Sequence, residues 1–140
     1  MATDPMGAPP APPASAGMSE DAVKFFLRVI AVVSLAFGAA ALLVPSVLTA
    51  LYEVDDTDAV AAALRFFGAE SLAWGLAVWF LAGVREAWRG LVTASLVLQV
   101  LLIASAIVAM ATGAAGPFMW QVVALSGVFA VIALWARRTA

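Results

Sequence analysis

The sequence predicts an all-α fold, an integral membrane four-helix bundle with a disordered Pro/Ala-rich N-terminal tail. Apolar residues make up 65% of the chain and charged residues 11%, whereas soluble domains are roughly 45–50% apolar and about 25% charged. Four long apolar stretches follow one another, each close to the ~20 residues that a helix needs to cross a bilayer. They do not alternate as β-barrel strands do, so each has to be a helix that satisfies its own backbone hydrogen bonds.

The N-terminal tail, residues 1–19, precedes the first apolar stretch. It holds five of the seven prolines and little apolar bulk, so it cannot offset the entropy of ordering and is expected to be disordered. A cleaved signal peptide does not fit, because the first charged residue is acidic and the apolar run exceeds the ~7–15 residues of a signal core. Residues 20–138 are then expected to form one transmembrane domain.

The first two spans are placed at residues 25–44 and 59–82. Pro45 has no amide hydrogen and therefore ends the first span. The mostly apolar residues after it indicate a short amphipathic segment on the membrane surface. An acidic loop follows, and Thr57 or Asp56 is expected to cap the second span.

The last two spans are placed at residues 91–111 and 118–136, separated by the uncharged turn TGAAGP. Six of the seven basic residues stand at span ends that a four-span chain brings to one side: Lys24, Arg28, Arg85, Arg89, Arg137 and Arg138. The positive-inside rule assigns that side to the cytoplasm. The sequence therefore predicts a protein integral to the plasma (inner) membrane, with both termini cytoplasmic.

The second span carries two charged residues in an apolar helix, Arg65 and Glu70. Glu70 falls near the middle of the span, where a charged side chain costs at least ~2.5–3.5 kcal/mol, so we expect it to face the bundle interior rather than lipid. The two side chains stand ~140° apart around the helix, which disfavours a direct pair. Arg65 is expected to reach the acidic loop. Gln99 is the best polar neighbour of Glu70 by depth, and Ser34 and Ser95 are the alternatives.

Two interpretations of Glu70, Arg65 and Gln99 stay open. In the first, they form an internal polar clamp that sets the register of the helices. In the second, they form a ligand or proton site, in which a protonated Glu70 donates a hydrogen bond or carries a proton.

Small residues at three- or four-residue spacing predict where helices pack closely. They are Ser34 and Gly38 in the first span, and Gly68, Ser71 and Gly75 in the second. This pattern is more typical of packing within one chain than of a dedicated dimer motif.

The residue types and motifs that the sequence lacks exclude several kinds of catalytic and cofactor-binding site. The chain has no Cys and no His, which excludes disulfides, thiol catalysis and histidine-ligated haem. It has no glycine-rich phosphate loop or hydrolase motif, and its basic residues stand at membrane boundaries rather than on a nucleic-acid surface. The sequence disfavours an enzyme and predicts no metal, no cofactor and no nucleic-acid partner.

The segment VPSVLTALYEV, the acidic loop after it and LRFFGAESLAWGLAVW resemble the small four-helix membrane proteins of the DoxX-like group, especially its uncharacterised branches. The resemblance covers most of residues 22–138. It implies a compact four-helix bundle, and some members of the group are attached to quinone-linked redox or oxidative-stress systems. Applied to this chain, it marks Arg65, Gly68, Glu70 and Gly75 as positions of interest.

Two functional classes follow. The first is a non-enzymatic accessory protein that associates with a larger membrane complex or binds a lipid-like ligand between its helices. The alternative is an oligomeric proton-coupled small-molecule transporter that uses Glu70. The expected partners are the lipid bilayer and a larger complex or a homo-oligomer.

Overall fold

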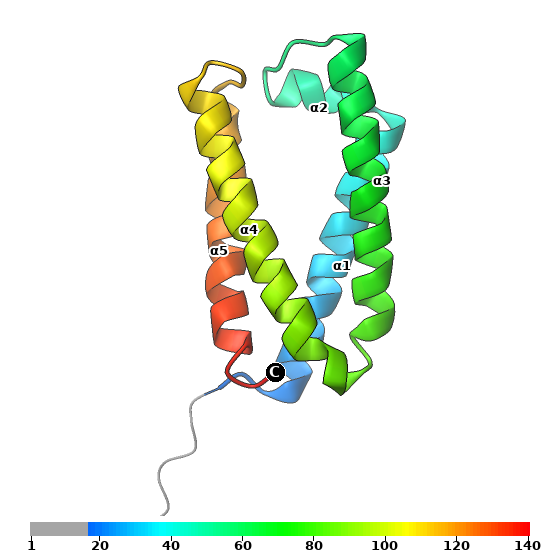
Figure 1. The fold of residues 1–140 in the computed structure, drawn as a ribbon, viewed down its shortest axis with the longest axis vertical. Helices are drawn as coiled ribbons and strands as arrows, with labels where there is room; N and C mark the ends of the chain where they lie inside the picture. Colours follow the sequence, from blue (N-terminus) through cyan, green and yellow to red (C-terminus); the bar gives the residue numbers. More distant parts are fainter. Residues whose placement is uncertain (1–16) are drawn as a thin grey trace, which may run out of the picture.

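A computed structural model describes residues 17–140, and its architecture is a bundle of four long helices (Figure 1). The helices in chain order are α1 (Glu20–Leu43), α2 (Pro45–Leu51), α3 (Asp58–Leu81), η1 (Arg85–Ala87), α4 (Trp88–Ala111), η2 (Pro117–Met119) and α5 (Trp120–Ala136). The predicted all-α fold with four long apolar helices is confirmed. The disorder expected for the tail lies, for residues 1–16, outside the described residues.

Four helices are long and apolar enough to cross a membrane, and no more than a third of the most apolar stretch of any of them is buried inside the bundle. Large outward side chains such as Phe66 (77% exposed) and Phe80 (73% exposed) cover their surfaces. A water-soluble protein rarely exposes so much contiguous apolar surface, whereas lipid solvates it. The chain is a small polytopic membrane protein, and its candidate spans imply a bilayer around them.

Both described ends of the chain lie at one end of the bundle, which we call the terminal end; α2 lies across the opposite end, the α2 end (Figure 1). At the terminal end the Thr139 hydroxyl donates a hydrogen bond to the carbonyl of Met18 at 2.6 Å. Arg85 and Glu20 form an exposed salt bridge of 2.6 Å there.

Polar caps set the helix boundaries. Ser19 caps α1 by accepting a hydrogen bond from the Ala22 amide at 3.3 Å, so α1 begins five residues before the expected position 25. Pro45 is the first residue of α2, where its missing amide hydrogen costs nothing. Of the two expected caps of α3, Thr57 is the one that accepts, from the Val60 amide at 3.3 Å.

The four long helices form two antiparallel pairs, α1 with α3 and α4 with α5. Glycines hold the first pair together: a Cβ added at Gly38 would lie 2.8 Å from the carbonyl oxygen of Gly68, and one at Gly68 would lie 2.8 Å from that of Gly38. Gly75 faces the Ala31 carbonyl in the same way, at 3.0 Å. The absence of side chains at these positions lets the two backbones approach.

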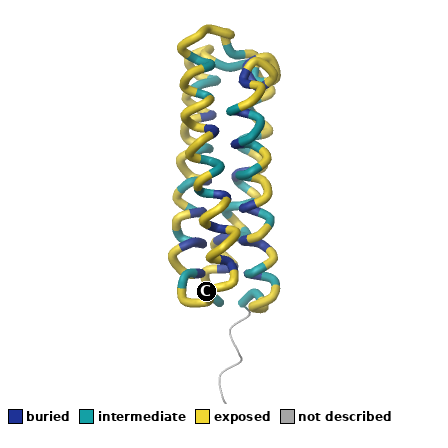
Figure 2. Tube along the Cα trace, turned by 90° about the vertical axis from the view of Figure 1, so that its right-hand side faces the viewer, coloured by how far each residue is buried: buried dark blue, intermediate teal, exposed yellow. Residues whose placement is uncertain are grey.

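The two pairs meet in a hydrophobic core at the terminal end. Its buried side chains come from all four long helices, and the bulkier ones are Val23, Phe26, Leu27, Ile30, Val78, Trp88, Leu91 and Val92. The indole of Trp88 donates a buried hydrogen bond of 3.0 Å to the Ala82 carbonyl, which anchors the turn between α3 and α4. Buried positions recur along this half of the bundle (Figure 2), whereas the pairs diverge toward the α2 end (Figure 1).

Candidate ligand cavity between the helix pairs

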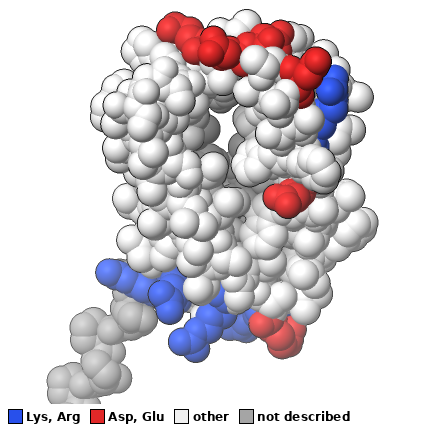
Figure 3. All heavy atoms as spheres, turned by 45° about the horizontal axis from the view of Figure 1, so that its top comes forward, with Lys and Arg blue, Asp and Glu red and all other residues white. Residues whose placement is uncertain are grey.

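The diverging helix pairs enclose a partly open cavity of about 630 Å³. The space-filling view shows the surface hollowed between the two pairs (Figure 3). Most of the lining is aliphatic or aromatic, including Ile30, Val33, Phe37, Leu48, Val60, Leu64, Phe67, Leu98, Leu102, Val122, Leu125 and Phe129. All four long helices and α2 contribute to it.

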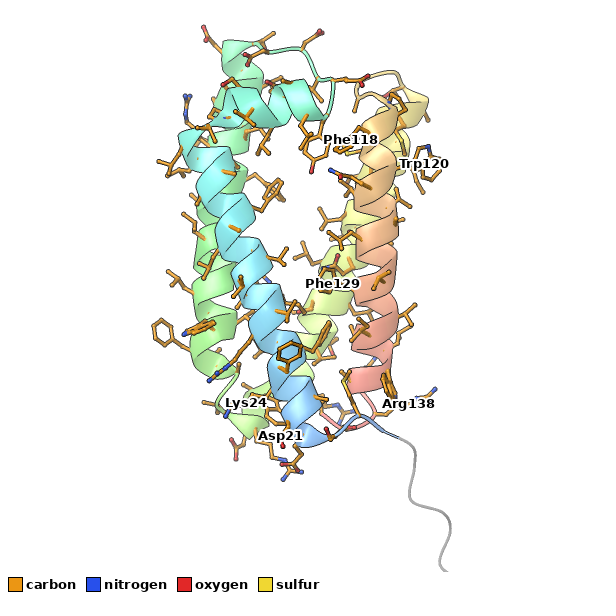
Figure 4. The ribbon with its side chains drawn as sticks, turned by 180° about the vertical axis from the view of Figure 1, so that it is seen from behind. Asp21, Lys24, Phe118, Trp120, Phe129 and Arg138 are labelled. Carbon is orange, nitrogen blue, oxygen red and sulfur yellow. The ribbon has the colours of Figure 1, made fainter. Side chains whose placement is uncertain are left out.

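Phe129 closes the floor of the cavity on the side of the terminal end. Its ring packs against that of Phe26 in the core, with centroids 6.1 Å apart, and it extends from α5 into the space between α5 and α1 (Figure 4). Because Phe26 is only 4% exposed, this contact seals the cavity from the terminal end.

A set of loop contacts, the α2-end clasp, closes the opposite end. Its residues are Tyr52, Gly116, Phe118 and Gln121. The Gly116 amide donates to the Tyr52 carbonyl at 3.0 Å, the Gln121 side chain donates to the Tyr52 hydroxyl at 3.3 Å, and the Phe118 ring lies 6.3 Å from that of Tyr52. The clasp joins the segment after α2 to the start of α5, so it bridges the two helix pairs above the cavity.

Gly116 fits the clasp because it has no side chain: a Cβ there would collide with the side chain of Glu53. Glu53 itself has a φ of 53°, in the left-handed region that residues other than glycine seldom adopt. The close approach of the two loops therefore depends on one glycine and on one strained residue.

Five polar residues of the lining, Ser34, Glu70, Ser71, Gln99 and Ser126, lie within about one helical turn of a common depth, and we call them the polar belt; the polar residues Thr49, Tyr52 and Ser105 line the cavity nearer the α2 end. Glu70 and Gln99 each stand eleven residues from the terminal-end boundary of their helices, Leu81 and Trp88, or about 16 Å along a helix. Ser71 and Ser126 stand ten residues from theirs. The glycine contacts, which set Gly38 between Gly68 and Leu72 and Gly75 between Ala31 and Leu35, put Ser34 about one helical turn nearer the terminal end than Ser71.

Gln99 is a buried member of the belt, with 8% of its surface exposed. Its side-chain amide lines the cavity and forms no hydrogen bond with any other residue in the described range 17–140. Glu70 lines the same cavity but is exposed, and it forms no ion pair with any residue of the described part of the chain. The structure thus brings these two predicted site residues to one cavity without bonding them to each other.

Arg65, the third predicted site residue, is exposed and does not line the cavity. Within residues 17–140 it forms no salt bridge with the acidic loop. Of the predicted packing positions, Gly38, Gly68 and Gly75 lie in the α1–α3 contact, whereas Ser34 and Ser71 line the cavity.

Sequence reasoning did not single out Trp74, and it named Ser95 only as a further polar neighbour of Glu70. In the described part of the chain, the indole Nε1 of Trp74 and the hydroxyl of Ser95 are buried without a hydrogen-bond partner, and Trp74 lines the cavity. The signal for Trp74 was its position: it stands inside a span rather than near the interface, where a membrane protein usually places tryptophan.

Charge is distributed unevenly along the bundle. The largest group of acidic side chains lies at the α2 end, where Figure 3 also shows a basic group, and the basic side chains concentrate at the terminal end, where it also shows an acidic group. Lys24 and Arg138 lie at a similar height at the terminal end (Figure 4). In the described residues no group of three or more acidic side chains is arranged to hold a metal ion.

No protein-family model, curated protein or solved structure matches this chain. The resemblance to the DoxX-like group has no support from these comparisons and stays a prediction.

Proposed function

We propose that this protein is a non-enzymatic membrane protein that binds a lipid-like molecule between its two helix pairs. The observation that carries the proposal is the partly open cavity of about 630 Å³, whose lining is mostly apolar. That volume falls within the ~300–1,000 Å³ of pockets that hold small-molecule ligands.

The size of the cavity argues that it is occupied. A dry void of about 630 Å³ would cost on the order of 15 kcal/mol at ~24 cal/mol per Å³, as much as the ~5–15 kcal/mol that stabilises a typical domain. Water is a poor filler, because each molecule needs two to four polar partners and the walls offer mostly hydrocarbon. A molecule taken from the bilayer fits the chemistry of the walls.

The closed ends favour entry from the side. The floor formed by Phe26 and Phe129 and the clasp at Tyr52 leave the hollow between the helix pairs as the route. In the membrane that route faces lipid. An accessory protein of this kind would present its ligand, or the surface around it, to a larger membrane complex.

Photolabelling in lipid nanodiscs tests the proposal. The probe is an alkyl diazirine, whose cross-links are mapped by mass spectrometry along α4, where Leu98 and Leu102 line the cavity while Val97 and Leu101 face outward. We expect labelling of Leu98 and Leu102 to saturate and to be displaced by unlabelled hydrocarbon. Labelling of Val97 and Leu101 should rise in proportion to the probe, because bulk lipid does not saturate. Proportional labelling at all four positions would contradict the proposal.

Proton-coupled transport through Glu70 is a second candidate, favoured by the position of this carboxyl group at the cavity without an ion pair among the described residues. Under this hypothesis, Glu70→Gln abolishes pH-dependent ligand binding or flux in reconstituted vesicles, because a glutamine carries no exchangeable charge. Asp58→Asn, which changes an acidic residue at the α2 end, is the matched control. Equal pH dependence in the unmodified chain and in Glu70→Gln would remove this candidate.

A further inference from the structure

Gln99 offers hydrogen bonds that the bundle does not use. The residue is 8% exposed, and its side chain lines the cavity and has no hydrogen-bond partner within residues 17–140. A primary amide carries two donors and one acceptor, and these groups cost free energy when they face an apolar space unpaired. An occupant with a polar group at this depth would satisfy it.

The charges around the cavity restrict that polar group. Among the cavity-lining residues in the described part of the chain, Glu70 alone is charged, and no Lys or Arg is present. An anionic end group would find no cation and would lie level with the Glu70 carboxyl. An uncharged hydroxyl or carbonyl group avoids both penalties and, unlike an ammonium cation, can accept a hydrogen bond from the N–H donors of the Gln99 amide.

Most of the hydrocarbon lining of the cavity lies on the α2 side of the polar belt, and only a short part, which includes Ile30 and Trp74, lies on the other side. The Phe26–Phe129 contact closes the cavity toward the terminal end, whereas Leu102 and Val122 continue the apolar lining toward α2. A molecule with one polar end therefore fits with that end at the floor.

Building on the proposed function, we infer that the occupant is an uncharged hydrocarbon molecule with one hydroxyl or carbonyl group, which hydrogen-bonds to Gln99. The chain extends from Gln99 toward α2 along the apolar walls. The site thus distinguishes a polar-ended lipid from a plain hydrocarbon of equal length.

Competition against the alkyl diazirine probe at Leu98 tests the inference. The competitors are dodecane, 2-dodecanone, 1-dodecanol, dodecanoate and dodecylamine, compared at equal amounts in the nanodisc. In the unmodified chain we expect 2-dodecanone and 1-dodecanol to displace the probe about tenfold more effectively than dodecane, the ratio that one buried hydrogen bond provides. Dodecanoate should be no better than dodecane.

A pair of variants ties the effect to Gln99. Gln99→Leu has a similar volume but cannot hydrogen-bond, so the tenfold preference should disappear while dodecane still competes. Ser105→Ala removes another polar group of the lining, six residues closer to the α2 end, and should keep the preference.

The competition results distinguish a failure of the proposed function from a failure of the inference about Gln99. If no competitor displaces the probe, the cavity does not bind lipid-like molecules and the proposed function fails. If dodecane and 2-dodecanone compete equally in the unmodified chain, hydrocarbon binds but the inference about Gln99 is wrong. If dodecylamine competes more strongly than 2-dodecanone and 1-dodecanol and loses this advantage in Glu70→Gln, the preferred polar group is a cation. That result would also overturn the inference.

Discussion

Gly38 and Gly68 control the approach of α1 to α3 because each faces the carbonyl oxygen of the other. A backbone atom cannot move aside as a flexible side chain can, so even one methyl group at either position has to separate the helices. Gly127 in α5 has no neighbouring atom within 4 Å of an added Cβ. Because the three glycines differ only in their surroundings, the effects of alanine substitutions at these positions can be compared directly.

Gly38→Ala is expected to lower the free energy of unfolding by about 1–3 kcal/mol, the usual cost of overpacking. Gly127→Ala should leave it unchanged or raise it by up to about 1 kcal/mol, because alanine favours helix more than glycine does. Reversible unfolding in mixed detergent micelles measures both. Equal effects of the two substitutions would mean that the α1–α3 contact is looser than described.

The residue scale is also where sequence reasoning was weakest. It placed Glu70 and Gln99 at equal depth, because depth follows from counting residues along each span. It could not show that Gln99 is buried while Glu70 is exposed, since α4 is apolar on nearly all sides and a membrane helix has apolar faces toward lipid and toward protein alike. Which side of such a helix faces inward depends on packing that hydropathy does not record.

At the scale of helices and loops, short polar residues mark where α1 and α3 begin. Ser19 and Thr57 are both N-caps, and the cap at Thr57 was predictable because a residue with a small polar side chain precedes an apolar run. The early start of α1 was harder to predict, because its first turn contains Glu20 and Asp21 and hydropathy alone excludes charged residues from a span. Both carboxylates are favourable near a helix N-terminus.

Thr57→Ala should destabilise the start of α3 by about 0.5–2 kcal/mol, since the Val60 amide loses its acceptor. Thr57→Ser keeps a hydroxyl at the cap and should retain most of the stability. Hydrogen exchange of the first turn of α3 reports the change locally. Identical exchange in the two variants would show that the cap contributes nothing.

For the whole molecule, the four long apolar helices and the position of both described chain ends at one end of the bundle followed from composition and span length. The cavity did not, because its volume arises from the divergence of two helix pairs that are joined at the terminal core and at the α2-end clasp. No single segment encodes that divergence. It results from bulky core residues at one end of the bundle and from a loop contact at the other.

The orientation of the bundle can be tested with single cysteines, because the chain has none of its own. Asp56→Cys at the α2 end should react with a membrane-impermeant thiol reagent on intact cells, whereas Gly83→Cys and Ala140→Cys at the terminal end should react only after permeabilisation. The excess of basic residues at the terminal end is the physical reason. Labelling of Ala140→Cys on intact cells would reverse the orientation, and labelling of Gly83→Cys without Ala140→Cys would break the four-span topology.

The closure of the cavity at both ends affects how a ligand would be supplied. A molecule that enters between the helix pairs arrives by diffusion within the plane of the membrane, so occupancy would follow its mole fraction among the lipids rather than its concentration in water. A sparingly soluble compound could then saturate the protein while remaining undetectable in the aqueous phase, and a change in membrane composition alone would change the loaded fraction.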